Sequence, residues 1–159
     1  MTLPQQLSKH FLQAYFGGSF SERHLAGELR GTALAQARRS VNGGNSVLAI
    51  VYHLHFYVRG VASVLRGDRL DTRDGASWET PVVETDEAWQ ALVEEVLAEG
   101  EVLAKALEGL GEEAVWSPFY SAGNAPVFTN VLGVLEHVYY HLGQIVLIGR
   151  DQRPPARAR

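Results

Sequence analysis

The amino-acid sequence predicts an all-α protein that folds as a four-helix bundle. Apolar residues recur at helical spacing in four long stretches, and glycines or polar segments separate these stretches. No stretch alternates apolar and polar residues as a strand would, and no internal repeat is evident. With 159 residues, 46% of them hydrophobic, the chain has the length of one domain and enough apolar surface for a core. We expect one domain over residues 1–150 and a disordered tail over residues 151–159.

The apolar periodicity places the long helices at residues 2–16, 46–66, 86–108 and 127–150. Short extra helices are expected around residues 21–29 and 33–39, between the first and second long helices. Asn45 or Ser46 is suited to cap the second helix. The third helix starts with acidic residues, which favour the positive end of the helix dipole, and Gly109 is expected to end it.

A long polar segment, residues 67–85, separates the second helix from the third. Antiparallel neighbours in a bundle need only a few linking residues. A crossover of this length is therefore expected to run along the bundle.

Composition excludes several classes of function. The net charge is −4, and basic residues cluster only at the extreme C-terminus, so a nucleic-acid partner is not expected. Cysteine is absent, which excludes disulfides, thiolate metal ligands and a cysteine nucleophile. The N-terminus lacks the apolar stretch of a signal peptide, and no uninterrupted apolar run approaches membrane-spanning length. The expected location is the cytoplasm, without a membrane partner.

Two histidines in the fourth helix, His137 and His141, stand four positions apart and project from one face, one turn apart. Two imidazoles at this spacing can bind one metal ion, although a hydrogen-bonded surface pair would have the same spacing. Asn130, Gly133 and Gln144 fall on the same line along the helix. This polar line runs beside the apolar side of the helix, so we expect it to face the interior or a cleft, where a metal would satisfy both imidazoles.

The second helix offers a third ligand. His53 lies in a stripe of small and polar residues that includes Tyr57, whereas His55, two positions on, projects from almost the opposite face. We therefore predict His53 as the third ligand and His55 as a packing or interface residue. His10 and His24 are expected at the surface.

Three neutral histidines would leave coordination positions open, which is the arrangement of catalytic rather than structural metal sites. Nitrogen ligands suit zinc or nickel, with iron or copper as alternatives. Tyr57, Asn130 and Gln144 are candidates to line a substrate pocket or to hydrogen-bond a ligand, although packing would explain Tyr57 and Gln144 equally well. No catalytic residue is assigned, because Glu136 points away from the histidines and Tyr140 lies on their flank. No glutamate has a histidine three residues later, which excludes a di-iron carboxylate site.

The chain resembles the DinB-like superfamily, most specifically in the segments NSVLAIVYHLHFYVRG (45–60) and GVLEHVYYHLGQIVLI (133–148). Agreement is weaker in GDRLDTRDGASWETP (67–81) and DEAWQALVEE (86–95). The resemblance implies an up-down-down-up bundle with metal ligands at His53, His137 and His141, and it implies a homodimer. Characterised relatives include transferases and isomerases that use low-molecular-weight thiols, such as bacillithiol or mycothiol, on small molecules. Many members have no assigned reaction.

Together these observations predict a metal-dependent small-molecule enzyme, either a thiol-dependent S-transferase or a hydrolase-like enzyme. The alternative is a non-catalytic dimeric bundle for stress response or ligand binding, in which the metal is structural. The aromatic loop at residues 116–120 could then cover a ligand pocket or a partner surface.

Overall fold

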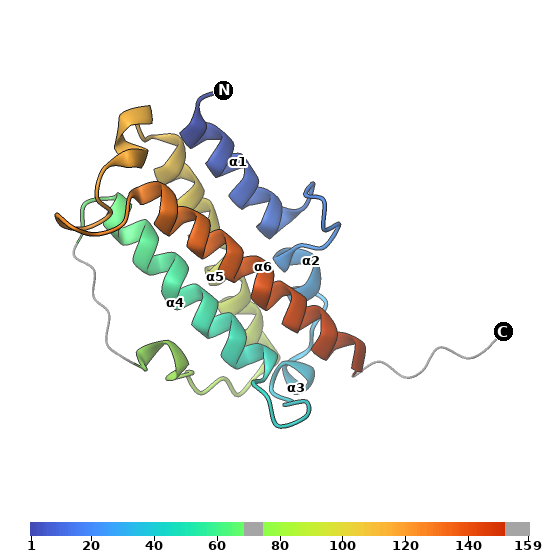
Figure 1. Cartoon of the computed structure of the whole chain (residues 1–159). Coiled ribbons are helices and arrows are strands. Elements are labelled where there is room, and N and C mark those ends of the chain that lie inside the picture. Colours follow the sequence, from blue (N-terminus) through green and yellow to red (C-terminus); the bar gives the residue numbers. More distant parts are fainter. Residues whose placement is uncertain (69–74, 152–159) are drawn as a thin grey trace.

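The structure, a computed structural model, describes residues 1–68 and 75–151 and is helical along most of them (Figure 1). The long helices are α1 (Leu3–Phe16), α4 (Val47–Leu65), α5 (Asp86–Glu108) and α6 (Val127–Asp151). The short ones are α2 (Leu25–Leu29) and α3 (Leu34–Ala37), with 3-10 turns η1 (Ala76–Trp78) and η2 (Glu112–Trp116). Within the described ranges the only β-type pairing is an isolated bridge between Pro118 and Pro126. The prediction of an all-α helical bundle is confirmed.

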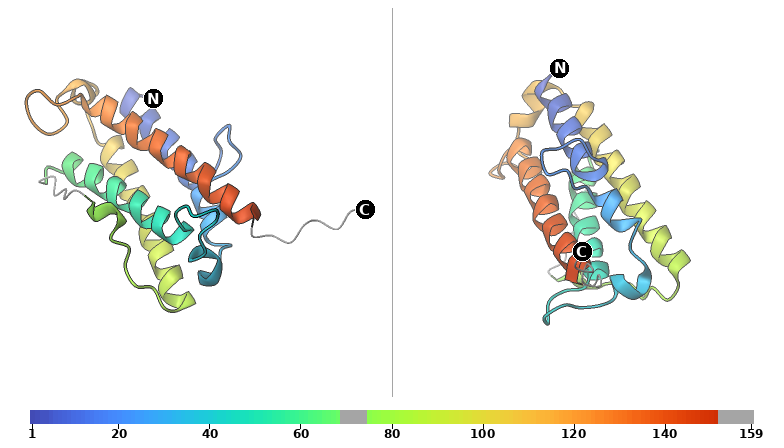
Figure 2. Two further views of the ribbon diagram at one scale, coloured as in Figure 1. Left: turned by 60° about the horizontal axis from the view of Figure 1, so that its bottom comes forward. Right: turned by 90° about the vertical axis from the view of Figure 1, so that its right-hand side faces the viewer.

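The four long helices are packed side by side (Figures 1 and 2). In these views α1 and α6 run in one direction, and α4 and α5 run in the other. Helix α5 packs against α1 and α4, and α4 also packs against α6. Because α4 and α5 point the same way, their connection has to return along the bundle. The described part of that crossover includes η1, which packs against α4; residues 69–74 lie outside the described ranges.

Side-chain caps set the helix beginnings close to their expected positions. The Ser46 hydroxyl accepts a hydrogen bond from the backbone N–H of Ala49 at the start of α4. The Thr85 hydroxyl does the same for Ala88 at the start of α5, whose first turn is acidic. Each cap satisfies a backbone donor that the helix itself leaves unpaired. Gly109 ends α5 as expected.

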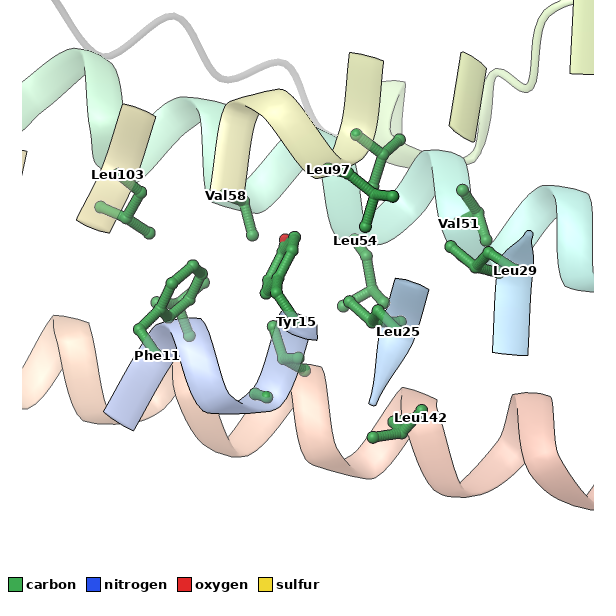
Figure 3. Close-up of a cluster of buried hydrophobic side chains, with 14 of the residues drawn as sticks. Phe11, Tyr15, Leu25, Leu29, Val51, Leu54, Val58, Leu97, Leu103 and Leu142 are labelled. Atoms are coloured by element: carbon green, nitrogen blue, oxygen red, sulfur yellow. The ribbon is translucent and has the colours of Figure 1, made fainter. Parts of the chain in front are cut away.

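Buried side chains from all four long helices and α2 form one core (Figure 3). Phe11 and Tyr15 of α1 point into the space between α4, α5 and α6. Trp89 of α5 is fully buried, and its indole N–H donates to the backbone carbonyl of Thr32 at 2.7 Å. This bond fixes the segment between α2 and α3 against α5, because a buried N–H needs a partner.

Two helices, α4 and α6, are long and apolar enough to cross a membrane by length and composition alone, which the prediction from the sequence did not anticipate. Half of the apolar window in α4 and 39% of that in α6 are buried inside the bundle. Core helices pass the same test, so this finding is weak evidence for a membrane segment.

The predicted tail begins inside a helix, because Asp151 is the last residue of α6. The rest of that tail, residues 152–159, lies outside the described ranges. The limits of the predicted domain, residues 1–150, stay a prediction.

Candidate metal centre

The histidines of α4 and α6 meet where these two helices pack together. His53 comes from α4, and His137 and His141 come from successive turns of α6. The Nε2 atoms of His53 and His137 are 3.1 Å apart. One ligand nitrogen from each of the three side chains lies within 4.8 Å of the other two. Two nitrogens bound to one zinc ion at tetrahedral angles would be about 3.3 Å apart. The His53–His137 pair matches this separation, and the three side chains are close enough that they could hold a single ion after a small approach of the donor atoms.

The three imidazoles are held in their neutral form, which is the form that binds metal. Burial, with a smaller contribution from the neighbouring His137 and His141, lowers the pKa of His53 to about 4, although a hydrogen bond with the Ser77 backbone acts in the opposite direction. Burial also lowers the pKa of His137, with His141 adding to the effect. Burial lowers the pKa of His141 too, although its hydrogen bond to Gln144 opposes this. Neutral rings keep a lone pair for a cation near pH 7.

Hydrogen bonds along α6 orient His141. Its Nδ1–H donates to Oε1 of Gln144 at 2.6 Å, and Nε2 of Gln144 donates to the Tyr140 hydroxyl at 3.1 Å. Since an amide oxygen only accepts, Nδ1 must carry the proton, and the lone pair of His141 is on Nε2. A bond of this kind, from the ring nitrogen that does not face the metal, fixes the tautomer and ring orientation in metal sites.

Aromatic rings surround the three histidines. The Trp78 indole stacks on the His53 ring, with centroids 3.7 Å apart and planes inclined by 17°. The rings of Tyr57 and His53 form a T-shaped pair with centroids 4.9 Å apart, and the centroids of Tyr57 and His137 are also 4.9 Å apart. Although these aromatic side chains are partly exposed, His53 itself is only 7% exposed. The site is therefore a polar patch with an apolar border, and it combines neutral nitrogen donors with local exclusion of water.

The structure brings most of the sequence-predicted site residues together. Tyr57 and Gln144 contact the histidines as described above, but Asn130 does not reach them in any described contact. Its side-chain amide donates to the backbone carbonyls of Ala125 and Pro126 at 3.3 and 3.1 Å. These bonds commit Asn130 to the start of α6, two turns before His137, so we leave it out of the site.

The other histidines lie elsewhere. His55 is buried on the side of α4 that faces α5, with Nε2 3.3 Å from the carboxylate of Glu95. Burial lowers the pKa of His55, and Glu95 opposes this effect. His10 is exposed as expected, whereas His24 is half-buried and caps α2 by accepting a hydrogen bond from the backbone N–H of Gly27. Within the described ranges, the three-histidine cluster is the only group of three or more metal-binding side chains.

Sequence reasoning left two residues beside the histidines out of the site. Tyr140 follows from helical spacing, because it lies four positions before Gln144 and the two side chains meet on the same face. No pattern in the sequence indicated that Trp78 would lie beside the histidines. It lies in the crossover, 25 positions after His53, and no periodicity connects a loop residue to a helix face.

Comparison with known proteins agrees with this fold. The chain is similar to a protein of known crystal structure, described as a conserved protein from Enterococcus faecalis, with 17% sequence identity and a TM-score of 0.67. That match covers 94% of this chain and 96% of the other, and at this identity it shows the fold alone. No curated protein matches the chain. The sequence profile of the DinB superfamily matches residues 21–145, a range that includes all three histidines, and the chain therefore belongs to the DinB superfamily.

Proposed function

We propose that the chain is a metal-dependent enzyme acting on small molecules, with His53, His137 and His141 as the ligands of one divalent ion. One observation carries this proposal: three neutral imidazole nitrogens converge to within 4.8 Å from two packed helices. Three protein ligands leave coordination positions for other molecules, as in catalytic zinc sites, whereas structural zinc sites use four protein ligands. Imidazole nitrogens suit zinc, nickel, iron and copper, and zinc or nickel is the ion proposed here.

The chemistry of the proposed site follows from its residues. A divalent ion supplies Lewis acidity there, which lowers the pKa of a water or thiol that reaches it. Burial keeps the histidines neutral, Gln144 fixes the ring of His141, and Trp78 and Tyr57 limit the access of water to His53. Because the chain has no cysteine, a thiol would have to come from a low-molecular-weight cosubstrate. The proposed reaction is transfer of that thiol to a small electrophile, or hydrolysis.

A structural metal is the second candidate, and one observation favours it. The ligands come from both α4 and α6. An ion shared between two helices would fasten them together and stabilise the bundle without any reaction.

Turnover and stability measured on the same samples separate the two candidates. The protein is loaded with Zn²⁺ or Ni²⁺ and assayed with a panel of low-molecular-weight thiols, electrophiles and activated esters. The enzyme proposal predicts turnover that disappears with a chelator and in the His53→Ala variant. A large loss of thermal stability with the chelator, without turnover for any substrate, would instead support the structural metal.

We also propose, from the family resemblance, that the protein forms a homodimer in the cytoplasm. Exposed apolar side chains such as Phe20 and Leu147 are available for contacts between copies. Light scattering on the purified protein would give the oligomeric state, and a monomer at micromolar concentration would contradict the proposal.

A further inference from the structure

Trp78 connects the crossover to the metal centre. It is the last residue of η1, whose other two residues, Ala76 and Ser77, are buried. Its indole lies nearly parallel to the His53 ring at a centroid distance of 3.7 Å, and it forms a T-shaped pair with the His141 ring at a centroid distance of 6.5 Å. The crossover therefore contributes one face of the environment of His53.

The hydrogen bond that normally orients a metal-binding imidazole is poorly formed at His53. Such a ring usually donates its second N–H to a carboxylate, a carbonyl or a water, and His141 satisfies this rule through Gln144. Nδ1 of His53 is buried and has no hydrogen bond of good geometry within the described part of the chain, and the contact between His53 and the Ser77 backbone is only a weak hydrogen bond. Packing therefore has to contribute to the ring orientation of His53.

The backbone around Trp78 is well suited to hold the indole in place. The N–H of Trp78 donates to the carbonyl of Gly75 at 3.0 Å. The carbonyl of Trp78 accepts from the backbone N–H of Thr80 at 2.8 Å and from its hydroxyl at 3.3 Å. Gly75 has a φ of 82°, a left-handed conformation that glycine adopts without strain. These bonds fix the backbone from which the indole projects.

We propose that Trp78 is a positioning residue of the metal centre: its indole holds the His53 ring at the angle at which Nε2 faces His137 and His141. The stacked indole thereby supplements the weak contact between His53 and the Ser77 backbone. The inference rests on the metal centre of the proposed function and on no particular reaction. A stacked aromatic pair contributes enough to change a binding constant roughly three- to tenfold, which sets the scale of the expected effect.

Three variants separate ring stacking from bulk. Trp78→Phe keeps an aromatic face over His53, Trp78→Leu keeps apolar bulk without a ring, and Trp78→Ala keeps neither. Trp116→Leu is the matched control, because Trp116 is also a partly exposed tryptophan, 56% against 41%, and it packs on Phe128 instead of the histidines. The probe is Co²⁺, titrated by calorimetry into protein first stripped with a chelator.

We expect Trp78→Phe to bind Co²⁺ within about twofold of the unaltered protein and Trp78→Leu to bind roughly three- to tenfold more weakly. Trp116→Leu should bind as the unaltered protein does. Equal Co²⁺ affinity in Trp78→Leu and the unaltered protein would overturn the inference, and so would equal weakening by Phe and Leu. Thermal unfolding of the metal-free variants identifies any variant that fails to fold. If Trp78→Ala does not fold, the comparison of Trp78→Phe with Trp78→Leu still tests the inference.

The outcome is independent of whether the protein is an enzyme. Weaker Co²⁺ binding in Trp78→Leu without any turnover would support the role of Trp78 and contradict the proposed reaction. Unchanged Co²⁺ binding in Trp78→Leu, together with metal-dependent turnover, would contradict the role of Trp78 and support the proposed reaction.

Discussion

Two of the three histidines at the metal centre are oriented by different kinds of neighbour. His141 is fixed by a hydrogen bond to Gln144 within its own helix. His53 is oriented by stacking on the ring of Trp78, a residue of the crossover. A hydrogen bond is directional, whereas a stack limits mainly the tilt of the ring. The two ligands should therefore respond to different substitutions.

Gln144 gives the first test at this scale. Gln144→Leu removes the acceptor for Nδ1–H of His141, leaves that buried N–H unpaired and frees the ring. We expect metal affinity to fall about 10-fold or more, within the range known for such outer hydrogen bonds. Gln144→Glu keeps an acceptor oxygen and should retain most of the affinity. Calorimetric titration with Zn²⁺ measures both variants, and equal affinity in Gln144→Leu and the unaltered protein would show that the hydrogen bond does not orient the ligand.

Five residues that lie at the site could be predicted from the sequence, because helical periodicity determines the face on which each one lies. His137, His141 and Gln144 share one helix, so their common face follows from the 3.6-residue repeat. His53 and Tyr57 follow from the same argument on α4. Asn130 lies on the same line as His137, but local backbone acceptors at the start of α6 take its amide. Periodicity predicts the helix face on which a side chain lies, but it does not predict the hydrogen-bond partner of that side chain.

At the scale of elements, α1 and α5 pack closely together at Gly100. A Cβ added at Gly100 of α5 would lie 2.3 Å from Cε1 of Tyr15, a ring that is fully buried. Real Cβ atoms essentially never show contacts under 3.0 Å, and the buried ring has no free space to move into. The absence of a side chain at Gly100 therefore sets how closely these helices pack.

Gly100→Ala should destabilise the protein by about 1–2 kcal/mol. The substitution gains roughly 0.5–1 kcal/mol of helix propensity, but overpacking a core costs about 1–3 kcal/mol. Gly143→Ala is the matched control, because Gly143 is exposed on α6 and has no neighbouring atom within 4 Å of the added Cβ. It should stabilise by about 0.5–1 kcal/mol. Urea denaturation measures both, and a stabilised Gly100→Ala variant would contradict this account of the α1–α5 contact.

Element boundaries were largely predictable because local chemistry determines them. Ser46 caps α4, and α5 ends at Gly109, as the sequence indicates. The turns η1 and η2 were not predicted, because a 3-10 turn of three to five residues has no apolar periodicity to detect. The crossover was recognised from its length, but its contact with the metal centre depends on tertiary packing.

At the scale of the whole molecule, the buried histidines make the metal-free protein sensitive to acid. A histidine in the unfolded chain takes up a proton near pH 6.5, whereas His53 in the folded chain does so only near pH 4. The pKa values of His137 and His141 are also lowered by folding. Below pH 6.5 the unfolded state therefore binds more protons than the folded state, and stability falls with decreasing pH.

We expect the free energy of unfolding of the chelator-treated protein to decline between pH 6.5 and 4 and to level off with respect to these groups above pH 7. Carboxylates also titrate at the acid end, so the control is a variant with all three histidines replaced by alanine. Its decline should be shallower over the same window. Urea denaturation at several pH values measures both proteins, and parallel curves would mean that the histidines are not buried in neutral form.

The central claim is that the α4–α6 contact holds one divalent ion through three histidines. Its most direct measurement is metal content after dialysis against Zn²⁺ and removal of the free ion. The account predicts one bound Zn²⁺ per chain, lost in His53→Ala, His137→Ala and His141→Ala. Retention is expected in His10→Ala, whose side chain is exposed and makes its described hydrogen bond to Gln13. Undiminished Zn²⁺ in the three site variants would contradict the account.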